Sequence, residues 1–208
     1  MKNFLALDTS GSYLTVIAEK EGERFSTFLP DCAMKHSVSW LTAVEETLKK
    51  ANMSLSDCDF FGVVVGAGSF TGIRIGISAI KGFCLAYQKP ALPVTSFDLT
   101  AYADKESGKT LCLVDALHDC YYACGYENGE VVYPPAFLTQ EEVLALQKEG
   151  YALRACAKMP IETVADLQVV DPVEGFYQAV YRLSAKEKFG EPVALYVRKS
   201  SAELNAQR

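Results

Sequence analysis

The chain has little of what metal-dependent or disulfide-stabilised proteins need. Its 208 residues include two histidines, His36 and His118, which are far apart and form no His-x-x-x-His or His-Glu-x-x-His pair. The seven cysteines form no Cys-x-x-Cys pair, and their total is odd. These patterns argue against a bound metal and a disulfide framework, and they favour reduced thiols in the cytoplasm. We expect His36 to cap a helix or lie on the surface, and His118 to be exposed in a hairpin turn.

Long apolar runs and an excess of positive charge are also missing. No apolar stretch is long enough to span a membrane, and Asp8 interrupts the apolar N-terminus too early for a signal peptide. The net charge is −6 and the isoelectric point is near 5.0. A protein that grips RNA by itself usually has a basic face, so any contact with RNA is expected to be indirect.

The most informative stretch is a glycine-rich turn between a strand and a helix. Residues 60–65 are apolar and predict a buried strand, and Gly66 and Gly68 then permit a tight turn. Ser69 or Thr71 is placed to cap the helix that follows, which runs from about residue 72 to 87. The spacing matches neither G-x-G-x-x-G nor a P-loop, so these glycines are interpreted as a steric requirement of the turn.

Two predicted helices are apolar on more faces than a single lobe of the protein can cover. They span residues 37–51 and 72–87; the second has a polar stripe of Arg74, Ser78 and Lys81 and a small-residue stripe of Gly72, Gly76 and Ala79. The small stripe either faces its own sheet or lets a partner helix come close, in which case two helices from each protein would form a four-helix interface. The residues predicted at a partner interface are Val38, Leu41, Ile73, Gly76, Ile77, Ile80 and Phe83.

A weak internal repeat divides the chain. Asp8 and Asp115 differ by 115 − 8 = 107 positions, and Gly22 and Gly129 differ by the same 129 − 22 = 107. Each half begins with the predicted order strand, strand, strand, helix, strand. We therefore predict two similar α/β lobes, residues 1–103 and 104–208, with a polar boundary at residues 104–109 and a last segment able to pack back on the first lobe.

The turn and the chain end also carry a family resemblance. Residues 66–76, Gly-Ala-Gly-Ser-Phe-Thr-Gly-Ile-Arg-Ile-Gly, resemble the signature of the TsaB family, and residues 196–198 resemble its Tyr-x-Arg ending. The chain departs from the family pattern at Ala67, where proline is usual, and at Leu117, where arginine is usual. The resemblance implies the duplicated fold of actin, Hsp70 and the sugar kinases, whose two lobes clamp a nucleotide.

The weak candidates for a nucleotide or metal contact are Asp8, Thr9, Gly11 and Asp115. Asp8 and Asp115 end equivalent strands, but aspartate also bonds readily to its own turn, and that second interpretation is favoured. The loop of residues 116–119 contains no glycine to cradle a phosphate. Ser69 lies outside a G-x-S-x-G elbow, so no nucleophile is predicted.

The resemblance further implies a role without catalysis. TsaB proteins resemble inactive paralogues of TsaD in the glycoprotease-like family and support threonylcarbamoyl transfer to adenosine of tRNA. The implied partners are a TsaD-type catalytic subunit, a TsaE-type P-loop ATPase, tRNA indirectly and, in isolation, a second copy. No cofactor is expected to bind the isolated chain firmly, whereas the complex has room for ATP or ADP. The alternative is a small kinase-like, nucleotide-binding enzyme of the same fold.

Overall fold

The computed structural model describes residues 2–103 and 108–198. Most of the predicted boundary, residues 104–107, lies outside this part, so the division after residue 103 stays a prediction. The elements of the first sheet and its helices are β1 (Phe4–Asp8), β2 (Leu14–Lys20), β3 (Glu23–Leu29), α1 (His36–Lys50), η1 (Leu55–Asp57), β4 (Phe60–Val64), α2 (Phe70–Tyr87), β5 (Ala91–Val94) and α3 (Ser96–Ala101). Those that follow are β6 (Lys109–Asp115), β7 (Cys120–Glu127), β8 (Glu130–Thr139), α4 (Gln140–Lys148), β9 (Ala152–Ala155), η2 (Pro160–Thr163), β10 (Leu167–Val169) and α5 (Pro172–Ala185).

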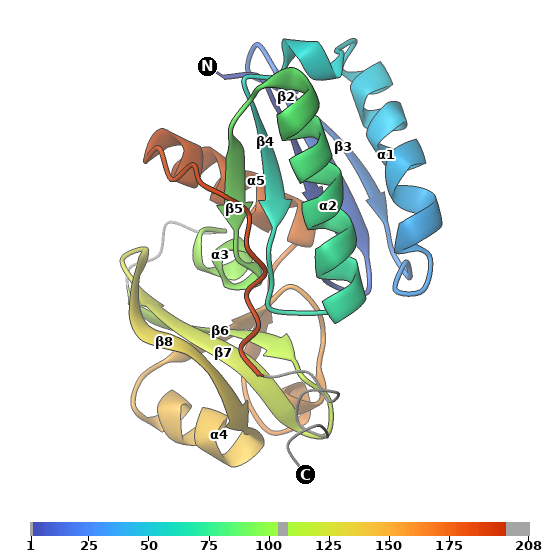
Figure 1. Ribbon diagram of the computed structural model, residues 1–208. Coiled ribbons are helices and arrows are strands. Elements are labelled where there is room, and N and C mark those ends of the chain that lie inside the picture. Colours follow the sequence, from blue (N-terminus) through green and yellow to red (C-terminus); the bar gives the residue numbers. More distant parts are fainter. Residues whose placement is uncertain (1, 104–107, 199–208) are drawn as a thin grey trace.

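The first lobe has three layers (Figure 1). Its five strands lie in the order β3-β2-β1-β4-β5, with β1 antiparallel to β2 and parallel to β4. Alternate residues of β1 face opposite sides: Leu5 and Leu7 pack with α1 and α2, whereas Phe4 and Ala6 pack with α5. Both faces of this sheet are therefore covered, which explains why β1 and β4 are apolar throughout.

The second lobe repeats the first in topology. Its strands lie in the order β10-β9-β6-β7-β8, so in both sheets the first three strands form an antiparallel meander and the last two add in parallel on the other side of the first strand. Asp8 and Asp115 end the equivalent strands β1 and β6. The predicted duplication and the actin-like α/β fold are confirmed.

One face of the second sheet is covered within its own lobe, and the other face joins the lobes. Val143 of α4 and Ile161 of η2 cover the first face. On the other face, Cys112 and Cys124 pack against Phe97 of α3 and Ala67, which come from the first lobe. This shared core holds the two lobes together.

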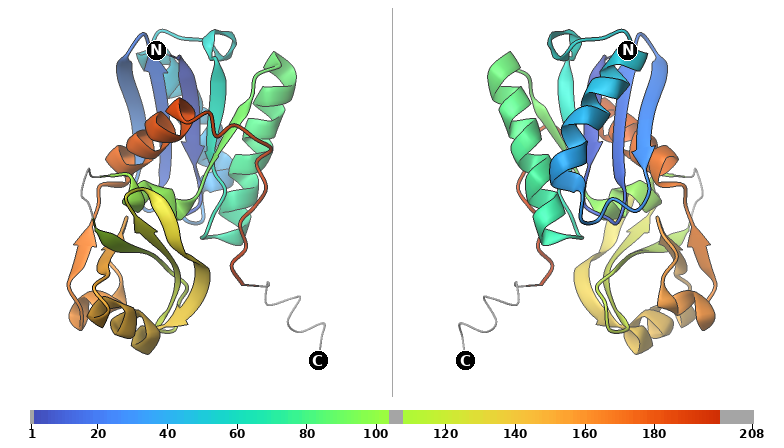
Figure 2. Two further views of the ribbon diagram at one scale, coloured as in Figure 1. Left: turned by 90° about the vertical axis from the view of Figure 1, so that its left-hand side faces the viewer. Right: turned by 90° about the vertical axis from the view of Figure 1, so that its right-hand side faces the viewer.

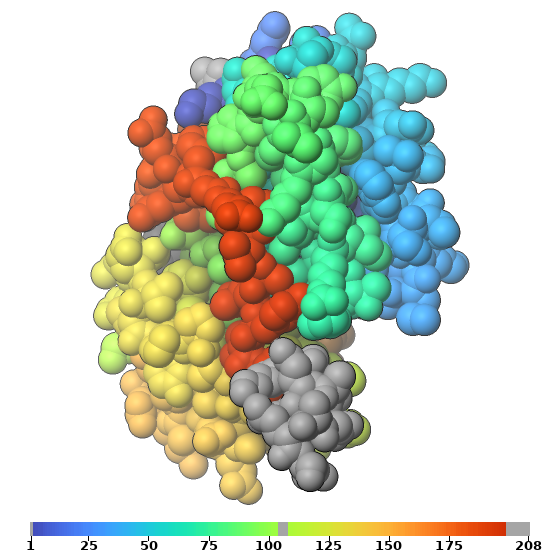
Figure 3. All heavy atoms as spheres, in the orientation of Figure 1, coloured from blue at the N-terminus to red at the C-terminus, as the bar shows by residue number. Residues whose placement is uncertain are grey.

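The end of the chain returns to the first lobe. Helix α5 buries Phe176, Ala179 and Val180 against the first sheet, so in space it belongs there (Figure 2). Residues 188–198, called here the C-terminal strap, then run alongside α2 toward the second sheet (Figure 3). Leu195 of this strap donates its backbone N–H to the Val65 carbonyl at 2.7 Å.

Helix caps and strand lengths follow local sequence with one clear exception. Ser69 caps α2 through a bond from the Gly72 N–H at 3.2 Å, and Thr139 and Glu142 form a capping box at the start of α4. The apolar sequence at residues 131–133 predicts a short strand, but β8 is longer because it continues through Pro134 and Pro135. It lies at the edge of its sheet, where proline is tolerated because one side of the strand needs no ladder hydrogen bonds. No helix in the described part of the chain combines the length and apolar character that a membrane span requires.

Candidate functional site: a helix groove and an interlobe cleft

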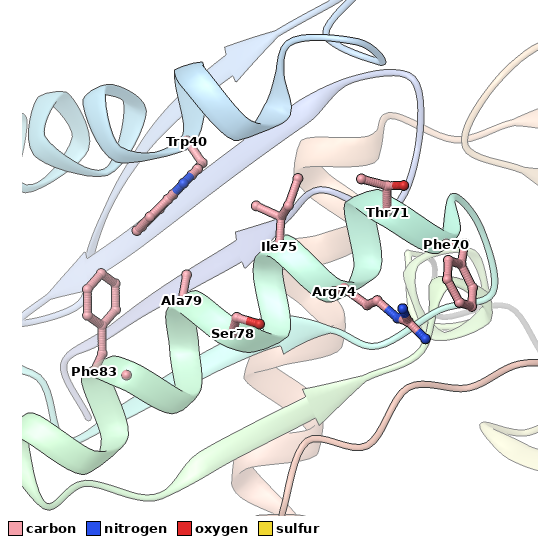
Figure 4. A pocket seen from close by; sticks show the side chains of 9 residues that line it. Trp40, Phe70, Thr71, Arg74, Ile75, Ser78, Ala79 and Phe83 are labelled. Atoms are coloured by element: carbon pink, nitrogen blue, oxygen red, sulfur yellow. The ribbon is translucent and has the colours of Figure 1, made fainter.

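Helices α1 and α2 leave an open groove on the outer face of the first lobe. This helix groove has a volume of about 820 Å³. It is lined by Trp40 of α1 and by Phe70, Thr71, Arg74, Ile75, Ser78, Ala79, Gly82 and Phe83 of α2. In Figure 4, Trp40 points from α1 toward Phe83, and their ring centroids are 6.2 Å apart. Between this aromatic pair and Phe70, the lining from α2 consists mostly of small or aliphatic side chains, so few bulky side chains block the approach of another helix along α2.

The helix predicted to carry an interface presents an open face, but four of the residues predicted for the interface lie on its buried side. Ile73 and Ile80 are fully buried in the core of the first lobe, and Ile77 is only 9% exposed. Gly76 is buried too, and a Cβ built on it would lie 2.7 Å from Thr9 Oγ1 and 3.3 Å from Val63 Cγ2. Ile73, Gly76 and Ile80 therefore face their own sheet, and Ile77 keeps only a small exposed area.

The remaining interface residues of the prediction are accessible. Val38 is 76% and Leu41 is 48% exposed on α1, and half-buried Phe83 lines the helix groove. Their role at an interface stays a prediction.

Most of the residues that line the groove are not among the seven predicted for the interface. They are Trp40 of α1 and Phe70, Thr71, Arg74, Ile75, Ser78 and Gly82 of α2, with Ala79 of the small-residue stripe. The signal was present, because the polar stripe of Arg74 and Ser78 marks the solvent side of α2. Small residues beside that stripe are the ones a partner can reach, whereas those opposite it face the sheet.

A second cavity, the interlobe cleft, lies between the two lobes. It has a volume of about 470 Å³ and is lined by residues 10–13, 67–69, 113–115 and 156–159 together with Ala33, Ser96 and Leu117. Gly11 and Asp115 are brought together here, as the duplicated fold predicts. Asp8 and Thr9 are fully buried and are not among the lining residues.

The candidate carboxylates bond to their own turns. Asp8 accepts from the N–H of Ser10 at 2.8 Å and from its hydroxyl at 2.7 Å, and Asp115 accepts from the Leu117 N–H at 2.8 Å. Thr9 donates its hydroxyl to the Gly72 carbonyl at 2.7 Å, which ties β1 to α2. Both aspartates therefore stabilise their own turns through these hydrogen bonds.

Burial changes the pKa of the Asp8 carboxyl. Desolvation raises the pKa of the Asp8 carboxyl, although the hydrogen bonds from Ser10 and the nearby His36 act in the opposite direction. Asp8 Oδ2 has no hydrogen-bond partner among the described residues. The folded chain therefore holds this proton more tightly than the unfolded chain.

This shift gives a prediction for Asp8→Asn. A carboxyl with a raised pKa loses stability as pH rises from its ordinary value through the folded value. The asparagine variant keeps an oxygen that accepts from Ser10 and removes the buried charge, so its thermal midpoint should exceed that of the wild type at pH 7. The difference should close near pH 4. Asp8→Ala is the control and should melt earlier than both at either pH, because Ser10 loses its acceptor. An asparagine variant less stable than wild type at pH 7 would show that the charge itself is needed.

The two histidines have different environments. His118 is exposed in the β6–β7 turn, as predicted. His36 is 2% exposed and its Nε2 lies 2.9 Å from the Tyr13 carbonyl oxygen. The N-cap position of α1 is Lys35, so the prediction that His36 caps a helix or lies on the surface was wrong. Within residues 2–103 and 108–198, no three His, Cys, Asp or Glu side chains are grouped closely enough to hold a metal ion.

The comparisons with known proteins agree with this fold. The family model described as "TsaD: tRNA N6-adenosine threonylcarbamoyltransferase" matches residues 15–198. The chain belongs to the TsaD family. Two crystal structures of YeaZ-type proteins from Pseudomonas aeruginosa superpose with TM-scores of 0.77 and 0.76. They are 26% and 24% identical and cover 95% and 94% of this chain and 100% of theirs. YeaZ is a TsaB-type protein, so the resemblance found in the sequence is confirmed.

The curated relatives in the TsaD family are much longer than the matched part. A tRNA N6-adenosine threonylcarbamoyltransferase of Staphylococcus haemolyticus is 40% identical over 73 residues, 35% of this chain and 21% of the relative. One from Staphylococcus aureus is 37% identical over 82 residues, 38% of this chain and 24% of the relative. The chain thus aligns with less than a quarter of each enzyme's length.

Proposed function

We propose that this chain is a non-catalytic subunit of a tRNA-modifying assembly. It pairs with a TsaD-type catalytic subunit and is needed for threonylcarbamoyl transfer to adenosine of tRNA. The observation that carries the proposal is the helix groove between α1 and α2, with its small-residue floor and open glycine.

Gly82 gives the strongest support for a partner in this groove. It lies inside α2, is exposed, and has no atom within 4 Å of where a Cβ would be. Glycine inside a helix costs about 1 kcal/mol relative to alanine. No contact within the described residues requires this glycine, whereas a partner helix crossing here would need a surface without side chains.

The interlobe cleft has poor chemistry for phosphate transfer. The β6–β7 turn places exposed Leu117 at the cleft instead of a glycine backbone. Asp115 already accepts a bond from that turn. A nucleotide clamp needs N–H donors aimed at phosphate oxygens, and an apolar side chain at that point disfavours it.

Other parts of the proposal follow the family. A TsaE-type P-loop ATPase joins the pair, tRNA contacts the assembly chiefly through the catalytic subunit, and the isolated chain pairs with a second copy through the same groove. ATP or ADP enters only in the complex, which works in the cytoplasm. The net charge of −6 supports the indirect contact with tRNA.

The interlobe cleft supports a second candidate function. A volume of about 470 Å³ between two actin-like lobes is enough for a small ligand, so a kinase-like, nucleotide-binding enzyme is the alternative. Titration of the isolated chain with a labelled ATP analogue separates the two. Tight binding without a partner would favour the alternative.

The proposal predicts a dependence of tRNA modification on this chain. The chain should co-purify with the TsaD-type protein of the same organism, and threonylcarbamoyl transfer to tRNA should be lost when the chain is omitted. The measurement is incorporation of labelled threonine into tRNA by the reconstituted proteins. Full transfer without the chain, or transfer by the chain without the TsaD-type protein, would contradict the proposed role.

A further inference from the structure

Arg74 closes one end of the helix groove and is held there in a fixed orientation. Its guanidinium carbon lies 3.7 Å from the ring centroid of Phe70, and its Nε donates to the Tyr196 hydroxyl at 2.9 Å. The Tyr196 and Phe70 rings stack with centroids 4.9 Å apart. Figure 4 shows the Arg74 and Phe70 side chains next to each other at this end of the groove.

The C-terminal strap fixes Tyr196 from both sides. Leu195 and Val197 pack into the core shared by the two lobes, and the Leu195 N–H bonds to the Val65 carbonyl. The guanidinium carbon of Arg198 lies 4.6 Å from the ring centroid of Phe137 in the second lobe. Tyr196 therefore belongs to an anchored segment, and the arginine it holds has lost much of its side-chain entropy before any partner arrives.

The terminal nitrogens of Arg74 remain available. Among the described residues Arg74 has no carboxylate partner, unlike three other surface cations, which form the pairs Arg24–Glu174, Lys81–Glu191 and Lys186–Glu130. Of the residues that the structure describes, Arg74 is also the one charged side chain that lines the helix groove. A stacked guanidinium whose Nε is already bonded presents its terminal N–H groups as a preformed fork.

We propose that Arg74 is the cationic anchor point of the groove and binds a carboxylate of the partner protein. The proposal rests on the proposed function, in which the TsaD-type subunit occupies the groove. An Asp or Glu side chain on the docking helix fits this end, since the rest of the lining is apolar or hydroxylic. A nucleic acid is disfavoured because one arginine on a chain of net charge −6 provides little attraction for a phosphate backbone.

Tyr196 then acts as a positioning residue. Its hydroxyl accepts a hydrogen bond from the Nε–H of Arg74, which leaves the terminal N–H groups of the guanidinium for another acceptor. Removing only that hydroxyl keeps the ring stack on Phe70 but frees the guanidinium to rotate. The strap thus links residues 195–198 to the binding strength of the groove.

The test measures the affinity of the full chain for the TsaD-type protein at several salt concentrations. Arg74→Gln should weaken pairing about tenfold and Arg74→Glu about a hundredfold, as expected for a close charge pair at an interface. Tyr196→Phe should weaken pairing about threefold. The affinity of Arg74→Gln should depend less on salt concentration than the affinity of the wild type does. Lys81→Gln is the matched control, because it removes the same charge from the same helix but from a residue outside the groove. Thermal midpoints of the four variants should match the wild type.

Two outcomes would refute the role of Arg74 as a carboxylate-binding residue, and a third would refute the proposed docking of the TsaD-type subunit in the groove. Affinity for Arg74→Glu equal to wild type would remove Arg74 from the interface. A loss seen only when nucleotide is present would assign the arginine to a phosphate and refute the carboxylate. If Gly82→Leu, which fills the groove, also pairs normally, the groove itself is not the docking site. A carboxylate partner is confirmed when one Asp→Arg or Glu→Arg change in the TsaD-type protein restores pairing with Arg74→Glu.

Discussion

Replacing Gly76 with arginine is expected to unfold the chain. A Cβ at residue 76 already lies 2.7 Å from Thr9 Oγ1 and 3.3 Å from Val63 Cγ2, so a longer side chain has no space. The guanidinium would be buried without a partner, which costs several kcal/mol out of a total stability of about 5–15 kcal/mol. Circular dichroism at 25 °C should show lost structure, and little soluble protein should be recovered.

Two further variants make this result specific to packing. Gly190→Arg is the control, because a Cβ on Gly190 meets nothing within 4 Å, and it should fold normally. Gly76→Ala should be destabilised by about 1–3 kcal/mol, since one added methyl group must displace Thr9 or Val63. A folded Gly76→Arg protein that had merely lost its partner would restore the interface role first predicted for this residue.

Much of the fold could be predicted because local and tertiary signals agree. The apolar run at residues 60–65, the cap at Ser69 and the capping box of Thr139 and Glu142 each specify structure within a few residues. The repeat offset of 107 positions predicted the duplication, and the two sheets with matching strand orders confirm it.

The orientation of α2 was harder to predict because small residues lie on two of its faces. Gly72 and Gly76 let the helix pack closely on Thr9, whereas Ser78, Ala79 and Gly82 lie on the open side. Composition cannot separate a glycine that its own fold needs from one that is left for a partner. The position of the adjacent β1–β2 turn decides between them, and only the tertiary structure gives that position.

The burial of His36 and the hydrogen bond between Arg74 and Tyr196 both depend on contacts between residues far apart in the sequence. Residues 74 and 196 are 122 positions apart, and no spacing rule connects them. Arg74 lies in the stretch that resembles the family signature, and Tyr196 lies in the stretch that resembles the Tyr-x-Arg motif. Their hydrogen bond becomes visible only when the strap is seen to return along α2.

Gly82→Leu should leave the chain folded and abolish its pairing with the TsaD-type protein. Because the site is open and helical, leucine should raise the stability of the isolated chain by about 0.5–1 kcal/mol through helix propensity. The same side chain fills the floor of the groove, where a close helix crossing leaves no room for it. We expect an affinity loss of about a hundredfold or more, which corresponds to about 3 kcal/mol. Stability and pairing thus change in opposite directions, which a general folding defect cannot produce.

The measurements are a thermal melt of the isolated chain and light scattering or calorimetry with the partner. Gly82→Ala is the graded variant and should lose less affinity than leucine while gaining the same stability. Ala145→Leu is the matched control, since it adds similar bulk to an exposed small residue on α4, away from the groove. Emission from Trp40, the one tryptophan of the chain, reports groove occupancy directly, because its ring lines the groove next to Phe83. Wild-type affinity in Gly82→Leu, together with an unchanged Trp40 signal on mixing, would place the partner on another surface.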